Sequence, residues 1–381
     1  MARSLFEQYF ESLPEFLGMK LGLSRINAAA KEAVGRIDAR LIHIAGTNGE
    51  GSTSFFIAQL PHQQGFSTVL FTSPHISSVT ERIQYNLSPV STEDFDTLFL
   101  AARPYVQKYH LSYFETVYLM TLIKCQQADP VYLILETGLG GRYDATNSSI
   151  TPVKIPVITS LSQDHKAQLG DKITDIIGEK AAIIGKNSPV FVACNPEFVI
   201  ERLQSLLSPQ TQLHIADTNN LDEARKLYSD PYSYNYMNAH AVAEYLTAKK
   251  LPYIKLKLPP CRQEIFGRVM LDGAHNASGV LSLLDSFAGD YPDAVIISAT
   301  KDRDIARLCR LFERKIRNII LTVIPDNERS IDEETLNILP YKSFMKPEDA
   351  LRYAQEAFSG KILIAGSLYL CAYMRERLVE S

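Results

Sequence analysis

Short runs of hydrophobic residues alternate with longer segments of helical spacing along most of this chain. In the first half, apolar runs at 41–44, 68–71, 131–135 and 156–160 predict buried strands, and apolar residues recur at helical spacing within segments such as 92–127. Strands that are buried on both faces and separated by helices are typical of a parallel sheet covered by helices on both sides. The pattern therefore predicts a doubly wound, mainly parallel-sheet α/β domain.

The same alternation resumes after a proline-rich segment. LPYIKLKLPPCRQE carries three prolines within ten residues, which favours an interdomain linker at about 256–261. Beyond it, strands are expected at 269–271, 294–298, 318–323 and 362–365. We therefore expect a first domain at 1–256 and a smaller, Rossmann-like α/β domain at 257–381. The length agrees, because 381 residues exceed the roughly 250 to 300 at which a single core stops growing.

Two stretches do not follow the alternation. Residues 205–235 are rich in Ser, Pro, Asn, Asp and Gln without a clear period, so we expect loops or a small irregular insertion there. Near the N-terminus, apolar residues from Leu5 to Leu17 have helical spacing, but Pro14 predicts a break or a kink.

Composition and charge exclude several classes of protein. A net charge of -4 without clusters of Lys and Arg gives no footprint for nucleic acid or an anionic membrane surface. The five cysteines are odd in number and lack CxxC pairs, which argues against a disulfide framework and against a zinc site. No apolar run approaches the ~18 residues of a membrane span, and the start of the chain lacks the apolar core of a signal peptide. We expect a cytoplasmic protein.

A glycine-rich segment, HIAGTNGEGS, lies between the first predicted strand and a helix that runs to Pro61. Its glycines allow positive φ angles and let the backbone approach a ligand closely. Backbone N–H groups at a helix N-terminus, together with the helix dipole, stabilise a bound anion. The segment therefore predicts a phosphate-binding turn made of Gly46, Thr47, Asn48, Gly49, Glu50, Gly51 and Ser52.

One residue of this turn contradicts the general phosphate-loop pattern. The pattern has a lysine directly after its last glycine to reach the phosphates, and this chain has Glu50 there; it also has Ile44 where the pattern has its first glycine. A plain tight turn between strand and helix is the structural alternative. We expect the turn to fold normally, with Glu50 directed at the phosphate position or paired with a nearby cation.

Eight segments occur along the chain in one order: HIAGTNGEGS, LFTSPHISSVTERI, LETGLGGRYDATN, TSLSQDHKAQLG, EKAAII, LDGAHNASG, TKDRDI and AGSLYL. Together they resemble the dihydrofolate synthase/folylpolyglutamate synthase family of the Mur-ligase superfamily, from about Leu21 to Tyr369 and most weakly at 205–250. The resemblance implies an ATP- and Mg²⁺-dependent ligase. In its reaction a pterin-bearing carboxylate takes the γ-phosphoryl group, and the amine of L-glutamate attacks the acyl phosphate. Dihydropteroate or a reduced folate is the implied acceptor, and a monomer is expected.

The resemblance also implies roles for individual residues. Magnesium would be held by Ser52, Ser73, Glu136 and His165, and the last three of these follow predicted strands of the first domain. Oxygen ligands suit a hard cation, whereas an imidazole is a softer choice. The pteroate site would include Ser73, Arg82 and Phe114. Taken singly, each of these residues has an ordinary structural explanation, such as a turn at Ser73–Pro74.

In the second domain, the resemblance places Arg262 at the ATP phosphates, Asp272 near the ribose, and His275 and Ser367 in the glutamate site. Cys261 stands where the family usually has glycine, and Ser367 is equally explained as a helix cap. The two groups of residues belong to different domains, so a cleft that closes near 256–261 is expected.

Lys180 matches the family position of a carbamylated lysine, whose added carboxylate would help hold a second magnesium ion. Together with His165 and Arg262 it completes the implied catalytic set. Carbamate formation requires the neutral amine, so the site would have to depress the lysine pKa.

Two functional hypotheses remain open. The first is an active ligase. The second is a catalytically impaired paralogue or variant, suggested by Glu50, that keeps the fold and a pterin or nucleotide site. A cell-wall ligase of the same superfamily is disfavoured, because those enzymes carry a nucleotide-sugar domain before the phosphate loop and only 45 residues precede Gly46 here.

Overall fold

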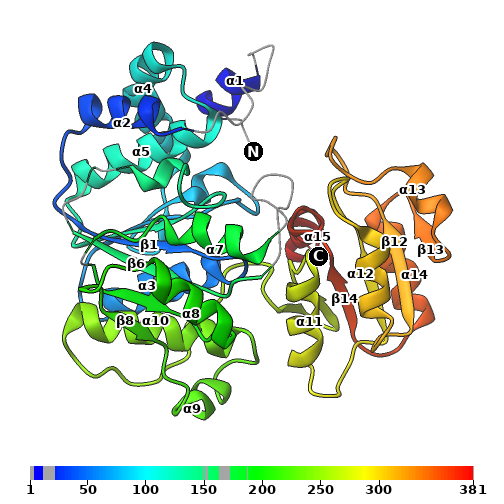
Figure 1. Ribbon diagram of the computed structural model, residues 1–381. Helices are drawn as coiled ribbons and strands as arrows, with labels where there is room; N and C mark the ends of the chain where they lie inside the picture. Colours follow the sequence, from blue (N-terminus) through cyan, green and yellow to red (C-terminus); the bar gives the residue numbers. More distant parts are fainter. Residues whose placement is uncertain are drawn as a thin grey trace. The chain divides into compact units, whose positions relative to one another are not determined.

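The computed structural model describes residues 4–11, 22–148, 150, 153–162, 172–186 and 188–380. The chain divides into two compact units, one made of Met1–Tyr228 with Tyr232–Lys257 and the other of Ser229–Pro231 with Leu258–Ser381. Each unit contains its own sheet (Figure 1). The main boundary between the two units falls after Lys257.

The first unit is built on an eight-stranded sheet in the order β4-β3-β2-β5-β1-β6-β7-β8. Its parallel strands are β1 (Arg40–Ala45), β2 (Thr68–Phe71), β5 (Tyr132–Glu136), β6 (Lys154–Ile158), β7 (Val190–Val192) and β8 (Leu213–Ile215). The strands β3 (Ile83–Tyr85) and β4 (Ser88–Pro89) extend it antiparallel at one edge. The predicted doubly wound, mainly parallel sheet is confirmed.

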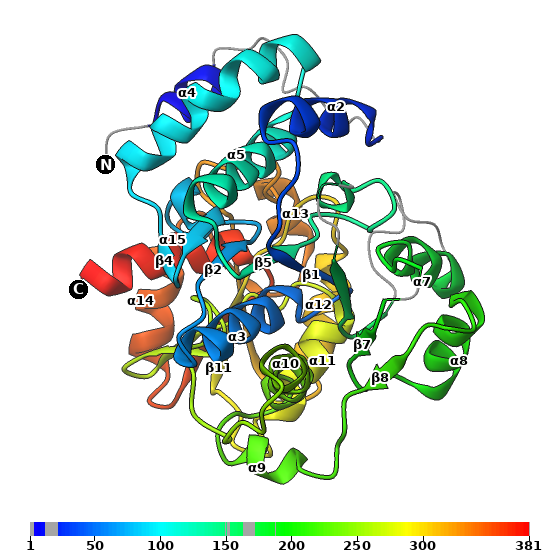
Figure 2. The same cartoon turned by 90° about the vertical axis from the view of Figure 1, so that its left-hand side faces the viewer.

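Helices cover both faces of this sheet (Figure 2). One face is packed by α2 (Ser24–Ala33), α4 (Thr92–Tyr109) and α5 (Tyr113–Ala128), and α3 (Glu50–Gln63) lies on the other face against α10 (Tyr232–Thr247). The remaining helices are α1 (Leu5–Glu11), α7 (Ile173–Ala181), α8 (Glu197–Leu206), α9 (Leu221–Arg225) and the 3₁₀ turns η1 (Val79–Arg82) and η2 (Ala145–Asn147).

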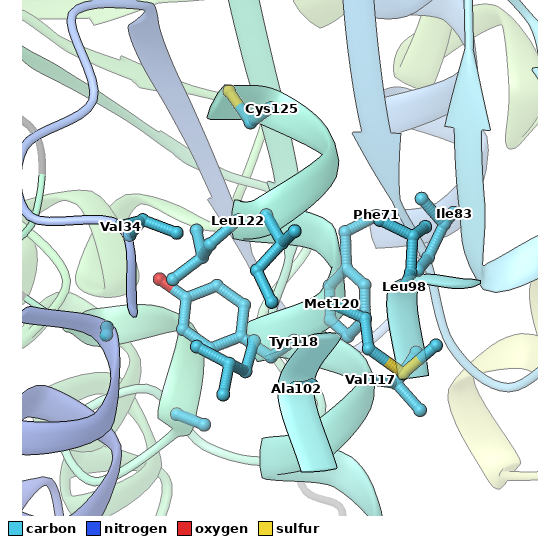
Figure 3. Packing of buried hydrophobic residues seen from close by; sticks show 14 of the residues in the cluster. Val34, Phe71, Ile83, Leu98, Ala102, Val117, Tyr118, Met120, Leu122 and Cys125 are labelled. Carbon is cyan, nitrogen blue, oxygen red and sulfur yellow. The ribbon is translucent and has the colours of Figure 1, made fainter. Parts of the chain in front are cut away.

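The core of the first unit explains why its central strands read as unbroken apolar runs. Val69, Leu133 and Leu135 are buried in one cluster with residues of α2, α4 and α5. The aromatic ring of Tyr118 in α5 is fully buried in this cluster. Met120 and Leu122 of the same helix are buried in it too (Figure 3). A strand with both faces covered exposes neither set of its alternating side chains, so the hydrophobic period of two disappears.

The second unit contains a six-stranded sheet in the order β13-β12-β11-β14-β10-β9. Its strands are β9 (Glu264–Phe266), β10 (Val269–Leu271), β11 (Ala294–Ile297), β12 (Asn318–Thr322), β13 (Lys342–Phe344) and β14 (Ile362–Ala365), with β9 antiparallel to β10. Its helices are α11 (Ala277–Ser286), α12 (Ile305–Phe312), α13 (Glu333–Ile338), α14 (Pro347–Ala357) and α15 (Leu368–Glu380). The second, smaller α/β fold is therefore also present.

The segment 205–235 differs from the expectation of irregular structure. It contains the end of α8, the strand β8, the helix α9 and the start of α10. Backbone hydrogen bonds such as Ala216 N–H to Val192 O dock β8 on β7. The side chains of β8 stay partly exposed, so this edge strand lacks the apolar run of the buried strands. Near the N-terminus, α1 ends at Glu11, and the expected break at Pro14 lies outside the described residues.

Candidate functional site

The glycine turn joins β1 directly to α3. The helix begins at Glu50, with Gly49 at the N-cap in a left-handed conformation (φ 92°). The turn is fastened to the segment that follows β6, because Thr47 N–H donates to Ser160 O at 2.8 Å and Ser160 Oγ donates to Asn48 O at 2.9 Å. The start of α3 therefore presents its N–H groups at the carboxyl edge of the sheet, as an anion site requires.

Two of the glycines have no room for a side chain. A Cβ atom on Gly46 would lie 1.7 Å from Thr159 Oγ1, and one on Gly49 would lie 2.5 Å from Asn235 Oδ1. Asn235 belongs to α10 and is buried against the turn, a placement that the sequence analysis missed. Because residues 205–235 show no clear period, the sequence analysis placed Asn235 in irregular structure and not in the helix α10.

The structure brings Ser73 and Glu136 together beside this turn. Their strands, β2 and β5, are neighbours in the sheet, and Ser73 N–H donates to Glu136 Oε2 at 2.8 Å. The other carboxylate oxygen of Glu136 lies 3.2 Å from the position that a Cβ on Gly51 would occupy. Glu136 and Ser52 are both buried.

Carboxylate and hydroxyl oxygens such as those of Glu136 and Ser52 are of the kind that a hard divalent cation takes as ligands. Within the described residues, no group of three or more His, Cys, Asp or Glu side chains forms a complete metal cluster. His165, the remaining predicted ligand, lies outside the described residues.

Lys180 reaches the same turn from α7. Its side chain is buried, its Nζ donates to Gly46 O, and its Nζ lies 3.9 Å from Glu50 Oε1. Of the two arrangements expected for Glu50, the structure shows the second, a pairing with a nearby cation. The loop after β5 holds α7 in place, because Arg142 N–H donates to Glu179 O at 3.0 Å.

The residues predicted for the pteroate site lie on neighbouring segments. The Arg82 guanidinium is 5.4 Å from the centroid of the Tyr113 ring, and Phe114 packs edge-on against Phe71 with centroids 5.5 Å apart. A Cβ on Gly138 would lie 2.5 Å from Phe114 Cζ, so the loop after β5 depends on a glycine under this ring. An aromatic ring and a guanidinium beside one another suit a flat, negatively charged ligand.

Arg82 is itself positioned by His75, whose Nδ1 accepts a hydrogen bond from Arg82 Nε at 2.9 Å. Burial, and then the positive charge of Arg82, lower the pKa of His75 to about 4. The neutral ring is therefore the form that accepts this hydrogen bond.

Acid should destabilise the protein partly through His75. Between pH 6.5 and about 4 the unfolded chain binds a proton on this histidine that the folded chain does not bind, so stability falls as the pH falls. We expect His75→Asn, which keeps an acceptor near Nδ1, to reduce the slope of unfolding free energy against pH in this window by at most about 1.4 kcal/mol per pH unit. Urea unfolding of both proteins at several pH values measures it. Identical slopes would show that His75 titrates normally.

In the second unit, the four predicted residues gather at the carboxyl ends of the neighbouring strands β10 and β14. Buried Asp272 accepts from Gln263 N–H at 3.1 Å and from Ala274 N–H at 2.9 Å, and His275 Nδ1 lies 2.9 Å from Gly273 O. Ser367 Oγ accepts from Tyr369 N–H at 3.2 Å, which is the cap expected at the start of α15. A Cβ on Gly273 would lie 2.3 Å from the Arg262 guanidinium.

Cys261 explains how the chain does without the usual glycine beside Arg262. Its φ is 57°, in the left-handed region that glycine adopts without strain, and its side chain is fully buried. The turn geometry is therefore kept, with a backbone strain that burial of the thiol offsets.

The chain is similar in sequence to known proteins along almost its whole length. The dihydrofolate synthase/folylpolyglutamate synthase of Bacillus subtilis is 28% identical over 95% of this chain and 96% of its own length. The dihydrofolate synthetase of Saccharomyces cerevisiae is 26% identical over 93% of this chain and 97% of its own length. A scan against protein-family models found no match.

Solved structures show the same fold. The folylpolyglutamate synthase of Mycobacterium tuberculosis, complexed with ADP and AMPPCP, superposes with a TM-score of 0.87 at 23% identity, covering 98% of this chain and 99% of that one. The bifunctional folylpolyglutamate synthase/dihydrofolate synthase of Yersinia pestis, complexed with AMPPNP and Mn, gives a TM-score of 0.84 at 23% identity, covering 98% of this chain and 97% of that one.

Proposed function

We propose that this chain, a relative of the dihydrofolate synthase/folylpolyglutamate synthase proteins over almost its whole length, is an ATP-dependent ligase. It adds L-glutamate to dihydropteroate, to (poly)glutamyl tetrahydrofolate, or to both. The observation that carries the proposal is the glycine turn at the start of α3 with Glu136 and Ser73 beside it. The comparisons give no support to the alternative of an impaired variant.

The residues of the first unit have separable tasks in this reaction. The N–H groups of the turn and the dipole of α3 hold the phosphates of ATP, and Ser52, Ser73 and Glu136 offer oxygens to magnesium. The metal supplies positive charge that offsets the negative charge gathered when a carboxylate takes the phosphoryl group. Arg82 and Phe114 hold the pterin-bearing substrate, whose carboxylate becomes the acyl phosphate.

The proposal also gives roles to four residues of the second unit. Arg262 and Asp272 contact ATP, and His275 and Ser367 hold the L-glutamate whose amine attacks the acyl phosphate. We expect a cytoplasmic protein and a monomer; all five cysteines lie in the described part of the chain as free thiols, the form that a reducing compartment maintains. Among the described residues, no helix is both long and apolar enough to cross a membrane.

The resemblance to the family also implies a carbamate on Lys180, which would help hold a second magnesium ion. Carbamate formation requires the neutral amine, and the side chain of Lys180 is buried at the glycine turn.

The proposed function is tested by incorporation of labelled L-glutamate. With ATP and Mg²⁺, we expect labelled product from dihydropteroate, from tetrahydrofolate, or from both, and consumption of one ATP per glutamate added. Removing the metal with a chelator should abolish the product, and restoring Mg²⁺ should recover it. Absence of product and of binding for both pterins, together with binding of a uridine-diphosphate sugar, would contradict the proposal.

A further inference from the structure

The chain passes between the two units more than once. It leaves the first unit after Tyr228, returns at Tyr232 and leaves again after Lys257, so Ser229–Pro231 is a short arm of the second unit. The sequence analysis expected a single linker at 256–261. Every restraint on a connecting segment removes conformational freedom from a hinge, so the contacts at both connections bear on how the units can move.

In the first unit, the two exits of the chain are bonded to each other. The Tyr228 hydroxyl donates to Leu256 O at 3.1 Å and accepts from Leu256 N–H. Burial raises the pKa of Tyr228 to about 12, so the hydroxyl keeps the proton that it donates. The Lys255 ammonium lies 4.0 Å from the centroid of the same ring and donates to Leu227 O. Tyr228 therefore ties the end of the first exit to the residues just before the second.

The last residue of the first unit is also held by the helix that starts at the glycine turn. Gln59 of α3 donates from Nε2 to Lys257 O at 2.9 Å, and its Oε1 accepts from Lys257 N–H at 3.0 Å. Its side chain is only 6% exposed. Farther back, Ile254 N–H donates to the Tyr236 hydroxyl of α10 at 3.0 Å. Residues 254–257, called the strap below, belong to no helix or strand, and these side chains fix them to α3 and α10.

In the second unit, the arm is bonded to the segment that follows the main boundary. Ser229 Oγ donates to Gln263 Oε1, and Gln263 Nε2 donates to Ser286 Oγ of α11 at 2.8 Å. The backbone N–H of Gln263 donates to Asp272 Oδ2 at 3.1 Å. Gln263 therefore joins the arm to α11 and to the residue that is proposed to contact ATP.

We propose that the hinge of this protein is a pair of chain connections, and that Gln59 and Tyr228 are positioning residues that hold its start to the helix of the glycine turn. The strap then stays fixed, and the bending occurs directly after Tyr228 and Lys257. This inference rests on the proposed function, in which the first unit holds the acceptor and the second unit holds L-glutamate. A hinge whose start is already ordered loses less conformational entropy when the two substrates are brought together.

The test separates the hinge from binding within the first unit. Steady-state kinetics are measured for the natural chain, Gln59→Met and Tyr228→Phe. We expect kcat to fall and the KM for L-glutamate to rise, each by about threefold to tenfold, the range for one lost hydrogen bond. Calorimetry in the presence of ADP measures the affinity for dihydropteroate or tetrahydrofolate, whichever the natural chain uses. This affinity should stay unchanged, because the residues proposed to hold the pterin lie within the first unit.

Tyr132→Phe is the matched control. The Tyr132 hydroxyl also donates to a backbone oxygen of the first unit, Leu246 O at 3.0 Å, but not to the strap. Its loss should leave kcat and the KM for L-glutamate unchanged. Hydrogen exchange gives an independent readout, because the amides of residues 254–257 should exchange faster in Tyr228→Phe and at the natural rate in Tyr132→Phe.

Ser229→Ala tests the second connection. It removes the hydrogen bond to Gln263 and leaves the strap intact, so we expect the same kinetic change as in Tyr228→Phe with natural exchange rates in the strap. Natural kinetics in Ser229→Ala would show that the hinge has one connection and not two.

Three results would overturn the role of the strap. They are natural kinetics in Tyr228→Phe, a parallel loss of pterin affinity, which describes a general loss of structure, and the same kinetic change in Tyr132→Phe. Thermal unfolding checks each variant, and Tyr228→Phe decides the question if Gln59→Met does not fold. In all these cases the natural chain still adds glutamate. A natural chain that adds none removes the proposed function and, with it, this inference.

Discussion

Replacing Gly49 by alanine is expected to abolish useful nucleotide binding and to lower the stability of the first unit. Gly49 has φ 92°, and an added Cβ would lie 2.5 Å from Asn235 Oδ1 and 2.9 Å from its Cγ. The left-handed backbone alone costs about 1 kcal/mol for alanine. Overpacking against a buried neighbour costs typically another ~1 to 3 kcal/mol.

The clash acts on the turn because Asn235 cannot easily retreat. It is buried in α10, the helix that packs along α3, and Gly49 is the N-cap of α3. A shift of either residue tilts the first N–H groups of α3 away from the phosphate position. We therefore expect a loss of affinity for the ATP analogue of roughly a hundredfold or more, which corresponds to about two misplaced charge-assisted hydrogen bonds.

Gly65→Ala is the matched control for this change. Gly65 also has a positive φ, 87°, but it is exposed after α3 and has no atom within 4 Å of an added Cβ. Gly65→Ala should lose only ~1 kcal/mol of stability, because alanine is strained at this φ, and its nucleotide affinity should stay normal. Calorimetry and thermal unfolding measure both effects. Equal behaviour of the two alanine variants would mean that the contact with Asn235 does not matter.

The second large effect is expected for Asp144→Ala, which should destabilise the first unit by about 4 kcal/mol, because a buried carboxylate and its hydrogen bonds to several backbone N–H groups are lost. The Asp144 carboxylate accepts from Gly138 N–H and Leu139 N–H, both at 2.9 Å, and from Thr146 N–H at 3.0 Å. Burial raises the pKa of this carboxyl, although these hydrogen bonds act in the opposite direction.

The loss should extend from stability to activity. Asp144 holds the loop whose Gly138 lies under Phe114 and whose Gly141 lies against Lys180, so the loop links the pteroate and phosphate residues. Removing Asp144 also takes a negative charge away from Lys154, whose pKa burial lowers to about 8. Ligase activity should therefore fall even in solutions where the variant is fully folded.

Asp38→Ala is the control for Asp144→Ala. Asp38 pairs with Arg36 at the surface, where both side chains are about three-quarters exposed (76% and 70%), and such a pair contributes about 0 to 1 kcal/mol. Urea unfolding measures the difference in stability, and glutamate incorporation at a temperature well below both transitions measures activity. Asp144→Ala with the stability and activity of the control would refute the proposed role of the loop.

The sequence by itself determined the α/β class, the parallel sheet and the glycine turn between the first strand and its helix. These features are local. A strand buried on both faces shows as an apolar run, as in Val131–Leu135, and a turn that needs positive φ shows as glycine at Gly49. The resemblance to the family also implied that Ser73 and Glu136 share a site at the carboxyl edge of the sheet, and Ser73 N–H does bond to Glu136.

Only the tertiary structure decided which distant residues meet at that edge. The strand order sets β5 between β2 and β1, and the docking of α7 and α10 brings Lys180 and Asn235 to the turn from far along the chain. The family resemblance implied a site role for Lys180, but the contacts of Lys180 with Glu50 and of Asn235 with Gly49 depend on the packing of whole helices rather than on neighbours in sequence. The meaning of Glu50 changes for the same reason: in the sequence it is an unexplained negative charge, and in the fold it is the partner of Lys180.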